Sequence, residues 1–219
     1  MEQIFANRAE AGSLLGEKLA QYKGRQDVIV LGLPRGGVPV AYQVSRSLGA
    51  PLDVLVVRKL GVPGLEELAL GAIASGGVRV LNEEVARSLP ASEEIIEGVT
   101  AREIAEVERR ERLYRDGRAA PEVRARIAIL IDDGLATGAT MNAAVRALRQ
   151  RGAAKIVVAV PVGPPETCRE LEREADEVVC AVTPLYFHAV GQYYEDFSQT
   201  TDEEVRNLLA RAAENRKPD

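Results

Sequence analysis

Residues 129–140 have the sequence Ile-Leu-Ile-Asp-Asp-Gly-Leu-Ala-Thr-Gly-Ala-Thr, in which an apolar run ends in two acids and a loop of small residues. The β-branched run from Ile127 to Ile131 predicts a strand that is buried on both faces. The small residues lead into a predicted helix from about Ala139 to Gln150, which Gly152 stops. A buried strand, a small-residue loop and a helix in this order favour an α/β fold with a parallel sheet.

The segments around this motif predict two strand–helix–strand units with parallel strands. The first unit would comprise a strand at 28–31, a helix at 38–48 closed by Gly49, and a strand at 52–57. The second would comprise the strand and helix described above, and a strand at 155–160. Further elements are expected as helices at 8–22, 166–174 and 202–213, the last capped by Thr201 or Asp202, and as a strand at 177–182.

The segment between the two units has a different pattern and is predicted to be an insertion. Apolar residues at 68–73 and 78–81 flank Ser75-Gly76-Gly77, which predicts a β-hairpin. A helix capped by Ser92 is expected at 93–114, with its many charges forming a solvated face. We therefore expect a single domain of residues 1–219, with a core at 24–60 and 126–182, an insertion at 61–125, and a hood and terminal helix at 183–215.

Composition limits the classes of function. Only 4% of the 219 residues are aromatic and none is Trp, so Val, Ile, Leu and Ala must fill the core. The net charge of −5 argues against a general electrostatic grip on nucleic acid or on an anionic membrane. Residues 1–8 lack the basic and apolar regions of a leader, so we expect a soluble, cytoplasmic protein.

Cysteine and histidine content argues against several kinds of site. Cys168 and Cys180 have neither a C-x-x-C spacing nor nearby histidines, so two free thiols are predicted in preference to a zinc site or a disulfide framework. His188 is the only histidine. Ser–His–Asp triads and His-based metal sites are therefore set aside.

The loop after the acids is predicted to bind a phosphate group. Small residues let successive backbone N–H groups point inward, beside a helix N-terminus whose partial positive charge favours an anion. Asp132 and Asp133, in front of the loop, could accept hydrogen bonds from sugar hydroxyls and hold Mg²⁺ through water. The predicted phosphate-binding residues are Gly134, Leu135, Ala136, Thr137, Gly138, Ala139 and Thr140, of which the threonines add hydroxyl donors.

Other nucleotide-binding motifs do not fit. The sequence contains no G-x-x-x-x-G-K-[ST], and residues 32–37, Gly-Leu-Pro-Arg-Gly-Gly, lack the G-x-G-x-x-G order. An ordinary surface turn would explain the glycines of 134–140, but it would leave paired acids and two threonines at one strand end without a cause. The phosphate-binding interpretation is therefore preferred.

Residues 129–140 resemble the motif with which type I phosphoribosyltransferases bind 5-phosphoribosyl-1-pyrophosphate (PRPP). In that motif four apolar residues and two acids precede a short loop of Thr, Gly and Ala. Gly134 departs from it, because most members carry an aliphatic residue at this position. The resemblance implies a mainly parallel, twisted sheet flanked by helices, with an insertion and a C-terminal hood. The whole pattern is also similar to an uncharacterised bacterial branch of the family.

Three further segments resemble the family in the expected order. The family's pyrophosphate loop, most closely that of the xanthine-guanine enzymes, corresponds to Pro34, Arg35, Gly36 and Gly37. The basic pair that begins the mobile catalytic loop corresponds to Arg58 and Lys59, with a loop closing over the site from Leu60 onward. The hood that covers the acceptor corresponds to the aromatic segment 183–197, with Tyr186 and Phe187 as substrate-binding residues.

The resemblance implies a PRPP- and Mg²⁺-dependent transferase that moves the phosphoribosyl group to a nitrogen acceptor, expected to be a nucleobase, and releases pyrophosphate. Asp132, Asp133, Lys59 and Arg35 would be its catalytic residues. The alternative is a regulator that senses PRPP or a nucleotide without useful turnover, since a fold alone does not decide between them. The expected partners are PRPP and a small-molecule acceptor, without nucleic acid or membrane, and a homo-oligomer is left open.

Overall fold

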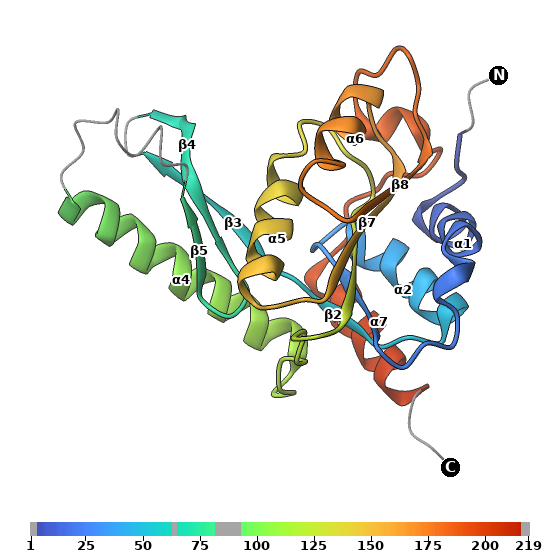
Figure 1. Ribbon diagram of the computed structural model, residues 1–219, viewed down its shortest axis with the longest axis horizontal. Helices are drawn as coiled ribbons and strands as arrows, with labels where there is room; N and C mark the ends of the chain where they lie inside the picture. Colours follow the sequence, from blue (N-terminus) through green and yellow to red (C-terminus); the bar gives the residue numbers. More distant parts are fainter. Residues whose placement is uncertain (1–3, 63–64, 82–92, 216–219) are drawn as a thin grey trace.

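The computed structural model describes residues 4–62, 65–81 and 93–215, so Pro63, Gly64 and the predicted cap Ser92 lie outside the described residues. At its centre is a five-stranded sheet of order β2-β1-β6-β7-β8, in which every neighbouring pair is parallel (Figure 1). The strands are β1 Val28–Gly32, β2 Leu52–Val54, β6 Ile127–Ile131, β7 Lys155–Val162 and β8 Glu177–Val182. The predicted α/β fold with a parallel sheet is confirmed.

Helices cover both faces of this sheet. They are α1 Arg8–Lys18, α2 Gly37–Leu48, α5 Ala139–Gln150, α6 Pro165–Leu171 and α7 Asp202–Glu214, with a 3-10 turn at Ala20–Tyr22 after α1. Val28 and Val30 of β1 pack with α1 and α2, whereas Ile29 of the same strand packs with α5 on the opposite face. Burial of each such side chain contributes about 1.5–3 kcal/mol, which explains why the strand is apolar throughout. None of the described helices combines the length and apolar character that a membrane span requires.

A second, antiparallel sheet consists of β3 Val57–Val62, β4 Leu65–Ala74 and β5 Val78–Leu81, so it begins four residues before the predicted insertion at 61–125. The predicted hairpin is present as β4 and β5. The prediction of one strand over residues 52–57 is wrong, because β2 ends at Val54 and the chain passes into the second sheet. Ser75 causes this break: its Oγ accepts from Val56 N at 2.8 Å, and its own N–H donates to Val56 O at 2.8 Å.

Helix α4, Glu93–Arg115, packs beside the second sheet and is held to the core by charged residues. The side chain of Arg115 is only 9% exposed, and its Nε lies 3.0 Å from Asp53 Oδ2 at the end of the parallel sheet. Its Nη1 lies 2.6 Å from Glu111 Oε1 one turn earlier. The expectation that the charges of this helix form only a solvated face is therefore wrong. Removal of one partner would leave a buried charge unpaired, which costs roughly 3–5 kcal/mol.

Cys168 of α6 and Cys180 of β8 form a disulfide, with Cα atoms 6.8 Å apart. The prediction of two free thiols is wrong. The chain between them completes the crossover from α6 to β8, so the pairing results from the parallel topology and not from a local cysteine motif.

The N-terminal segment lies beside the hood, so residues far apart in the sequence meet there (Figure 1). Phe5 N donates to Tyr193 O at 2.8 Å, and Glu195 N donates to Phe5 O at 2.8 Å. Beyond the hood, α7 begins after Thr201, whose side chain accepts from Glu204 N. Of the two predicted caps, Thr201 is therefore the one that the structure uses.

Candidate functional site

The acid pair lies at the carboxyl end of β6, directly beside the end of β1. Gly32 and Ile131 are paired in register, so the loops that follow the two strands leave the sheet side by side. Leu33 N donates to Ile131 O at 2.8 Å and fixes this arrangement. The two predicted glycine-containing loops, 33–37 and 132–138, are therefore brought together, as expected for ligand sites at the carboxyl edge of an α/β sheet.

Two glycines allow the 33–37 loop to approach the acids closely. A Cβ atom at Gly37 would lie 2.6 Å from Ile131 O and 2.8 Å from the Cα of Asp132. A Cβ atom at Gly36 would collide with the carboxylate of Asp133. The Pro34–Arg35 peptide bond is cis. Gly36 and Gly37 thus lie against the acid pair. The roles predicted for Pro34 and Arg35 in the same loop stay predictions.

The two carboxylates lie in a poorly solvated environment. Burial and the neighbouring Asp133 raise the pKa of Asp132 well above its usual range, although the Asp133 N–H donates to Asp132 Oδ1 at 2.9 Å. Burial also raises the pKa of Asp133, and the nearby Arg8 opposes this shift. Arg8 Nε lies 2.9 Å from Asp133 Oδ2, with the two side chains 12% and 16% exposed. A pair of this kind favours a ligand that supplies positive charge or hydrogen-bond donors.

Contacts with β7 and α6 hold the predicted phosphate-binding loop at 134–140, called the phosphate loop below. Leu135 N donates to β7 at 2.8 Å and anchors the start of the loop. Gly138 has a φ of 70°, in the left-handed region that favours glycine, and no side chain caps α5 after it. Thr167 Oγ1 donates to Ala136 O at 3.1 Å and supports the loop from α6. Ala139 N, the first of α5, donates to Oγ1 of the exposed Thr137 at 3.5 Å, so this hydroxyl lies at a helix N-terminus, where backbone N–H groups can bind an anion.

The glycine that departs from the family motif is explained by the hood. A Cβ atom at Gly134 would lie 2.5 Å from Val190 Cγ1 and 3.2 Å from Val162 Cγ1. In addition, Tyr194 OH donates to Asp133 O at 2.6 Å. The hood thus packs directly on the beginning of the phosphate loop, and the absence of a side chain at Gly134 makes room for it.

Arg58 and Lys59 point to opposite faces of β3, as consecutive strand residues do. Arg58 Nε lies 3.0 Å from Glu103 Oε2 of α4, so this side chain joins the sheet to the helix. Lys59 lines a cavity of about 330 Å³ between the second sheet and α5, and Thr140 of the phosphate loop lines it as well. The predicted mobile loop does not begin at Leu60, because Leu60 is a fully buried residue of β3.

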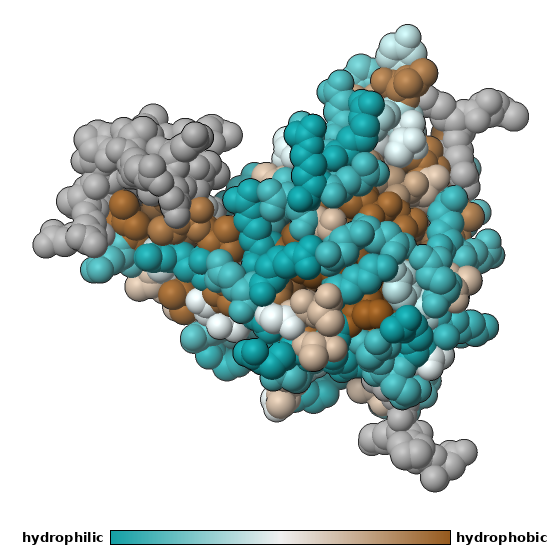
Figure 2. Space-filling model, viewed as in Figure 1, coloured by the Kyte–Doolittle hydropathy of each residue, from teal (hydrophilic) through white to brown (hydrophobic). Residues whose placement is uncertain are grey.

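This cavity has an apolar floor. Figure 2 shows apolar residues gathered on the second sheet, and the cavity lining includes Val57, Ala72, Val80 and Leu81 from that sheet and Ala139 and Ala143 from α5. Of the described residues that line it, none belongs to the 33–37 loop. Lys59 therefore lies in the same cavity as Thr140. Burial raises the pKa of the Tyr114 hydroxyl of α4 to about 12, and the charge of Arg35 opposes this shift.

The two predicted hood aromatics differ in their surroundings. Phe187 stacks on Tyr193 with ring centroids 5.8 Å apart, so its ring packs within the hood. Tyr186 is 80% exposed. The aromatic residue that contacts the acid pair is Tyr194, within the aromatic segment but not singled out from the sequence. Arg8 was also missed, and no local pattern around it points to Asp133.

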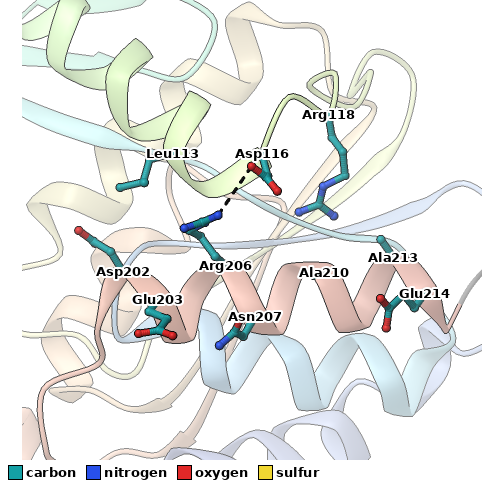
Figure 3. Close-up of a pocket in the computed structure, with 10 residues that line it drawn as sticks. All are labelled: Leu113, Asp116, Arg118, Asp202, Glu203, Arg206, Asn207, Ala210, Ala213 and Glu214. Carbon is teal, nitrogen blue, oxygen red and sulfur yellow. Dashed lines mark ion pairs between the residues drawn. The ribbon is translucent and has the colours of Figure 1, made fainter.

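A larger cavity, of about 650 Å³, lies between the end of α4 and α7 (Figure 3). Figure 3 shows charged side chains of both signs around it, with Arg206 Nη2 3.7 Å from Asp116 Oδ1. Residues of the acid pair and of the phosphate loop do not line this cavity. It is therefore separate from the candidate site.

Comparisons with known proteins agree with this geometry. A family model described as a phosphoribosyl transferase domain matches residues 1–198. The chain is 50% identical over 210 residues to a Mycobacterium tuberculosis protein that is named provisionally as a phosphoribosyl transferase. The match covers 96% of this chain but 47% of the relative, so the chain spans about half the length of the curated relatives it matches.

A solved structure extends the similarity to the fold. The protein TT1426 from Thermus thermophilus has a TM-score of 0.84 and 44% sequence identity, with 96% of this chain and 99% of that chain covered. Together with the family match over residues 1–198, these findings show that the chain belongs to the phosphoribosyltransferase family.

Proposed function

We propose that the protein transfers the 5-phosphoribosyl group of PRPP to a ring nitrogen of a nucleobase and releases pyrophosphate. The observation that carries this proposal is the contact between the two loops at the carboxyl edge of the sheet, where Gly36 and Gly37 lie against Asp133 and Asp132. In the proposal, the pyrophosphate loop, the ribose site and the phosphate-binding loop would surround one ligand.

Each part of PRPP has candidate partners. Backbone N–H groups of Gly134–Thr140, with the hydroxyls of Thr137 and Thr140, would bind the 5-phosphate. Asp132 and Asp133 would accept hydrogen bonds from the ribose hydroxyls. Backbone N–H groups of Gly36 and Gly37, together with Arg35, would bind the pyrophosphate. Tyr186, whose ring is exposed, would be the hood residue available for stacking on a planar acceptor.

The acid pair is suited to Mg²⁺, which takes carboxylate oxygens together with water and substrate phosphates. Among the described residues no group of three or more His, Cys, Asp or Glu side chains could hold a metal ion, so in the proposal water and substrate oxygens would complete the coordination. When bound, Mg²⁺ would neutralise negative charge on the pyrophosphate and polarise it as a leaving group.

In the proposed reaction the acceptor nitrogen attacks C1 of the ribose from the face opposite the pyrophosphate. The new N–C1 bond would form while the C1–O bond breaks, the electron pair would leave on the pyrophosphate oxygen, and the acceptor nitrogen would lose its proton to solvent water. Positioning and electrostatic stabilisation supply the catalysis. Arg35 would stabilise the charge that grows on the leaving oxygen, and Lys59 would reach the phosphates from the cavity beside α5.

The test is to screen a panel of nucleobases for pyrophosphate release with Mg²⁺ and PRPP. Release that depends on one base supports a transferase. Tight PRPP binding without base-dependent release with any acceptor would contradict the enzyme and favour a regulator that senses PRPP.

A cytoplasmic location is also part of the proposal. Because disulfides are rare in a reducing cytosol, the thiol state of Cys168 and Cys180 in cells tests it.

A further inference from the structure

Arg8, the first residue of α1, connects three parts of the molecule at the acid pair. Its Nε lies 2.9 Å from Asp133 Oδ2, and its Nη1 donates to Ser198 O at 2.7 Å. Its guanidinium carbon also lies 4.1 Å from the ring centroid of Phe197, which is within the range of a cation–π interaction. One side chain therefore holds the carboxylate of Asp133 and the end of the hood together.

The backbone around this contact is fixed from both sides. Asn7 caps α1 by accepting from Ala9 N and Glu10 N, which sets the direction in which Arg8 leaves the helix. Asp196 N donates to Ala6 O at 3.0 Å, so the N-terminal segment and the hood remain paired next to Arg8. These contacts fix the backbone on both sides of Arg8 and hold its guanidinium next to Asp133.

Arg8 is the cationic partner of the Asp133 carboxylate. Its Nε donates to Oδ2, the neighbouring Asp132 side chain also interacts with this carboxylate, and a Cβ atom at Gly36 would collide with the same Oδ2. A carboxylate that is held at one oxygen by a guanidinium presents its other oxygen in a constant direction. The direction in this case is set by contacts with α1 and the hood, not by the phosphate loop alone.

We propose that Arg8 is a positioning residue for ribose recognition: it orients the Asp133 carboxylate to accept a hydrogen bond from a ribose hydroxyl while it docks the N-terminal segment and hood beside that sugar. This inference rests on the proposed function, because it assigns a role at the same site. It predicts that Arg8 affects recognition of the sugar and leaves recognition of the phosphate unchanged, since the cradle at the start of α5 does not contact Arg8.

The experiment is calorimetry with two probes, ribose 5-phosphate and methyl phosphate, on the full chain. In the wild type, ribose 5-phosphate is expected to bind more tightly than methyl phosphate. Arg8→Ala should weaken ribose 5-phosphate binding by roughly tenfold, the loss expected for one charge-assisted hydrogen bond, and change methyl phosphate binding by less than about twofold. Arg8→Lys, which keeps the charge but not the planar fork, should restore part of the selectivity.

Arg126→Ala is the matched control. Arg126 Nη2 donates to Val28 O at 2.7 Å at the opposite, amino-terminal edge of the sheet, so its loss removes a structural arginine without touching the acid pair. This variant should keep wild-type selectivity. If Arg8→Ala weakens both probes equally, or if Arg126→Ala reduces selectivity as much, the positioning role is wrong although the proposed function stands. If the wild type binds neither probe, the proposed function fails as well.

Discussion

Gly37 lies so close to Asp132 that a Cβ atom on Gly37 would be only 2.8 Å from the Cα of Asp132. The same Cβ atom would be 2.6 Å from the carbonyl oxygen of Ile131. Gly37 is the first residue of α2, and Asp132 follows β6. The contact therefore joins the start of a helix in one strand–helix–strand unit to the end of a strand in the other. Both clashing atoms belong to the backbone, so rotation of a side chain cannot relieve the clash.

Gly37→Ala should separate the two loops and lower both stability and PRPP affinity. Overpacking of this kind costs about 1–3 kcal/mol. Gly98→Ala is the matched control, because Gly98 lies within α4 and a Cβ atom there would meet nothing within 4 Å. That variant should gain about 0.5–1 kcal/mol from helix propensity. Urea denaturation measures the stability of both variants. A Gly37→Ala variant as stable as the wild type would contradict the close approach.

Asp132→Asn should stabilise the ligand-free protein near neutral pH, because burial and Asp133 raise the pKa of the Asp132 carboxyl in the folded state. The folded state then binds more protons than the unfolded state, so stability falls as the pH rises through the folded pKa. The gain should appear as a Tm increase of about 2–4 °C at pH 7 and vanish below the unfolded pKa of roughly 4. Thermal melts of metal-free protein from about pH 3.5 to 8 measure this dependence.

Asp27→Asn is the comparison, because the pKa of Asp27 is shifted in the opposite direction to that of Asp132. The hydrogen bond from Arg25 lowers the pKa of Asp27, so this carboxylate stabilises the fold above its unfolded pKa and loses that contribution as the pH falls. Its substitution should produce no gain at neutral pH. A Tm difference between Asp132→Asn and the wild type that does not change with pH would contradict the raised pKa of Asp132.

Lys59→Ala should lower kcat by more than it weakens PRPP binding, because negative charge on the leaving pyrophosphate grows as the C1–O bond stretches. A loss of about 2–4 kcal/mol in transition-state stabilisation is expected by comparison with removal of an oxyanion donor. Arg58→Ala is the control, since its side chain pairs with Glu103 on the other face of β3. Single-turnover pyrophosphate release beside equilibrium binding separates the two effects. Equal losses in binding and turnover would place Lys59 at the 5-phosphate.

The parallel core could be predicted because local sequence defines its elements. β6, α5 and β8 have the bounds that the sequence predicted, since each is an apolar or periodic run followed closely by acids, glycine or proline. The break between β2 and β3 could not be predicted, because it depends on the hydrogen bond from Val56 N to Ser75 Oγ, 19 residues further along the chain. That partner is chosen by tertiary packing, which overrides the local preference for a continuous strand.

The candidate site could likewise be predicted only where its residues form contiguous motifs. The acids and the glycine loops are contiguous motifs, whereas Arg8 reaches Asp133 across 125 residues and Tyr194 reaches it across 61 residues. The disulfide likewise depends on how α6 is placed against β8. Contacts that are made only by the folded topology leave no trace in the local sequence, which is why these residues were missed or misassigned.

Calorimetric titration of the wild type and Thr137→Glu with PRPP in the presence of Mg²⁺ tests the central claim most directly. The substitution places a carboxylate at the N-terminus of α5, where the 5-phosphate is proposed to bind. Binding to the wild type and a loss of roughly 100-fold or more in the variant are predicted, while Gln150→Glu, which introduces one carboxylate at the far end of the same helix, should bind normally. Unaltered PRPP affinity in folded Thr137→Glu, or no binding to the wild type, would contradict the assignment.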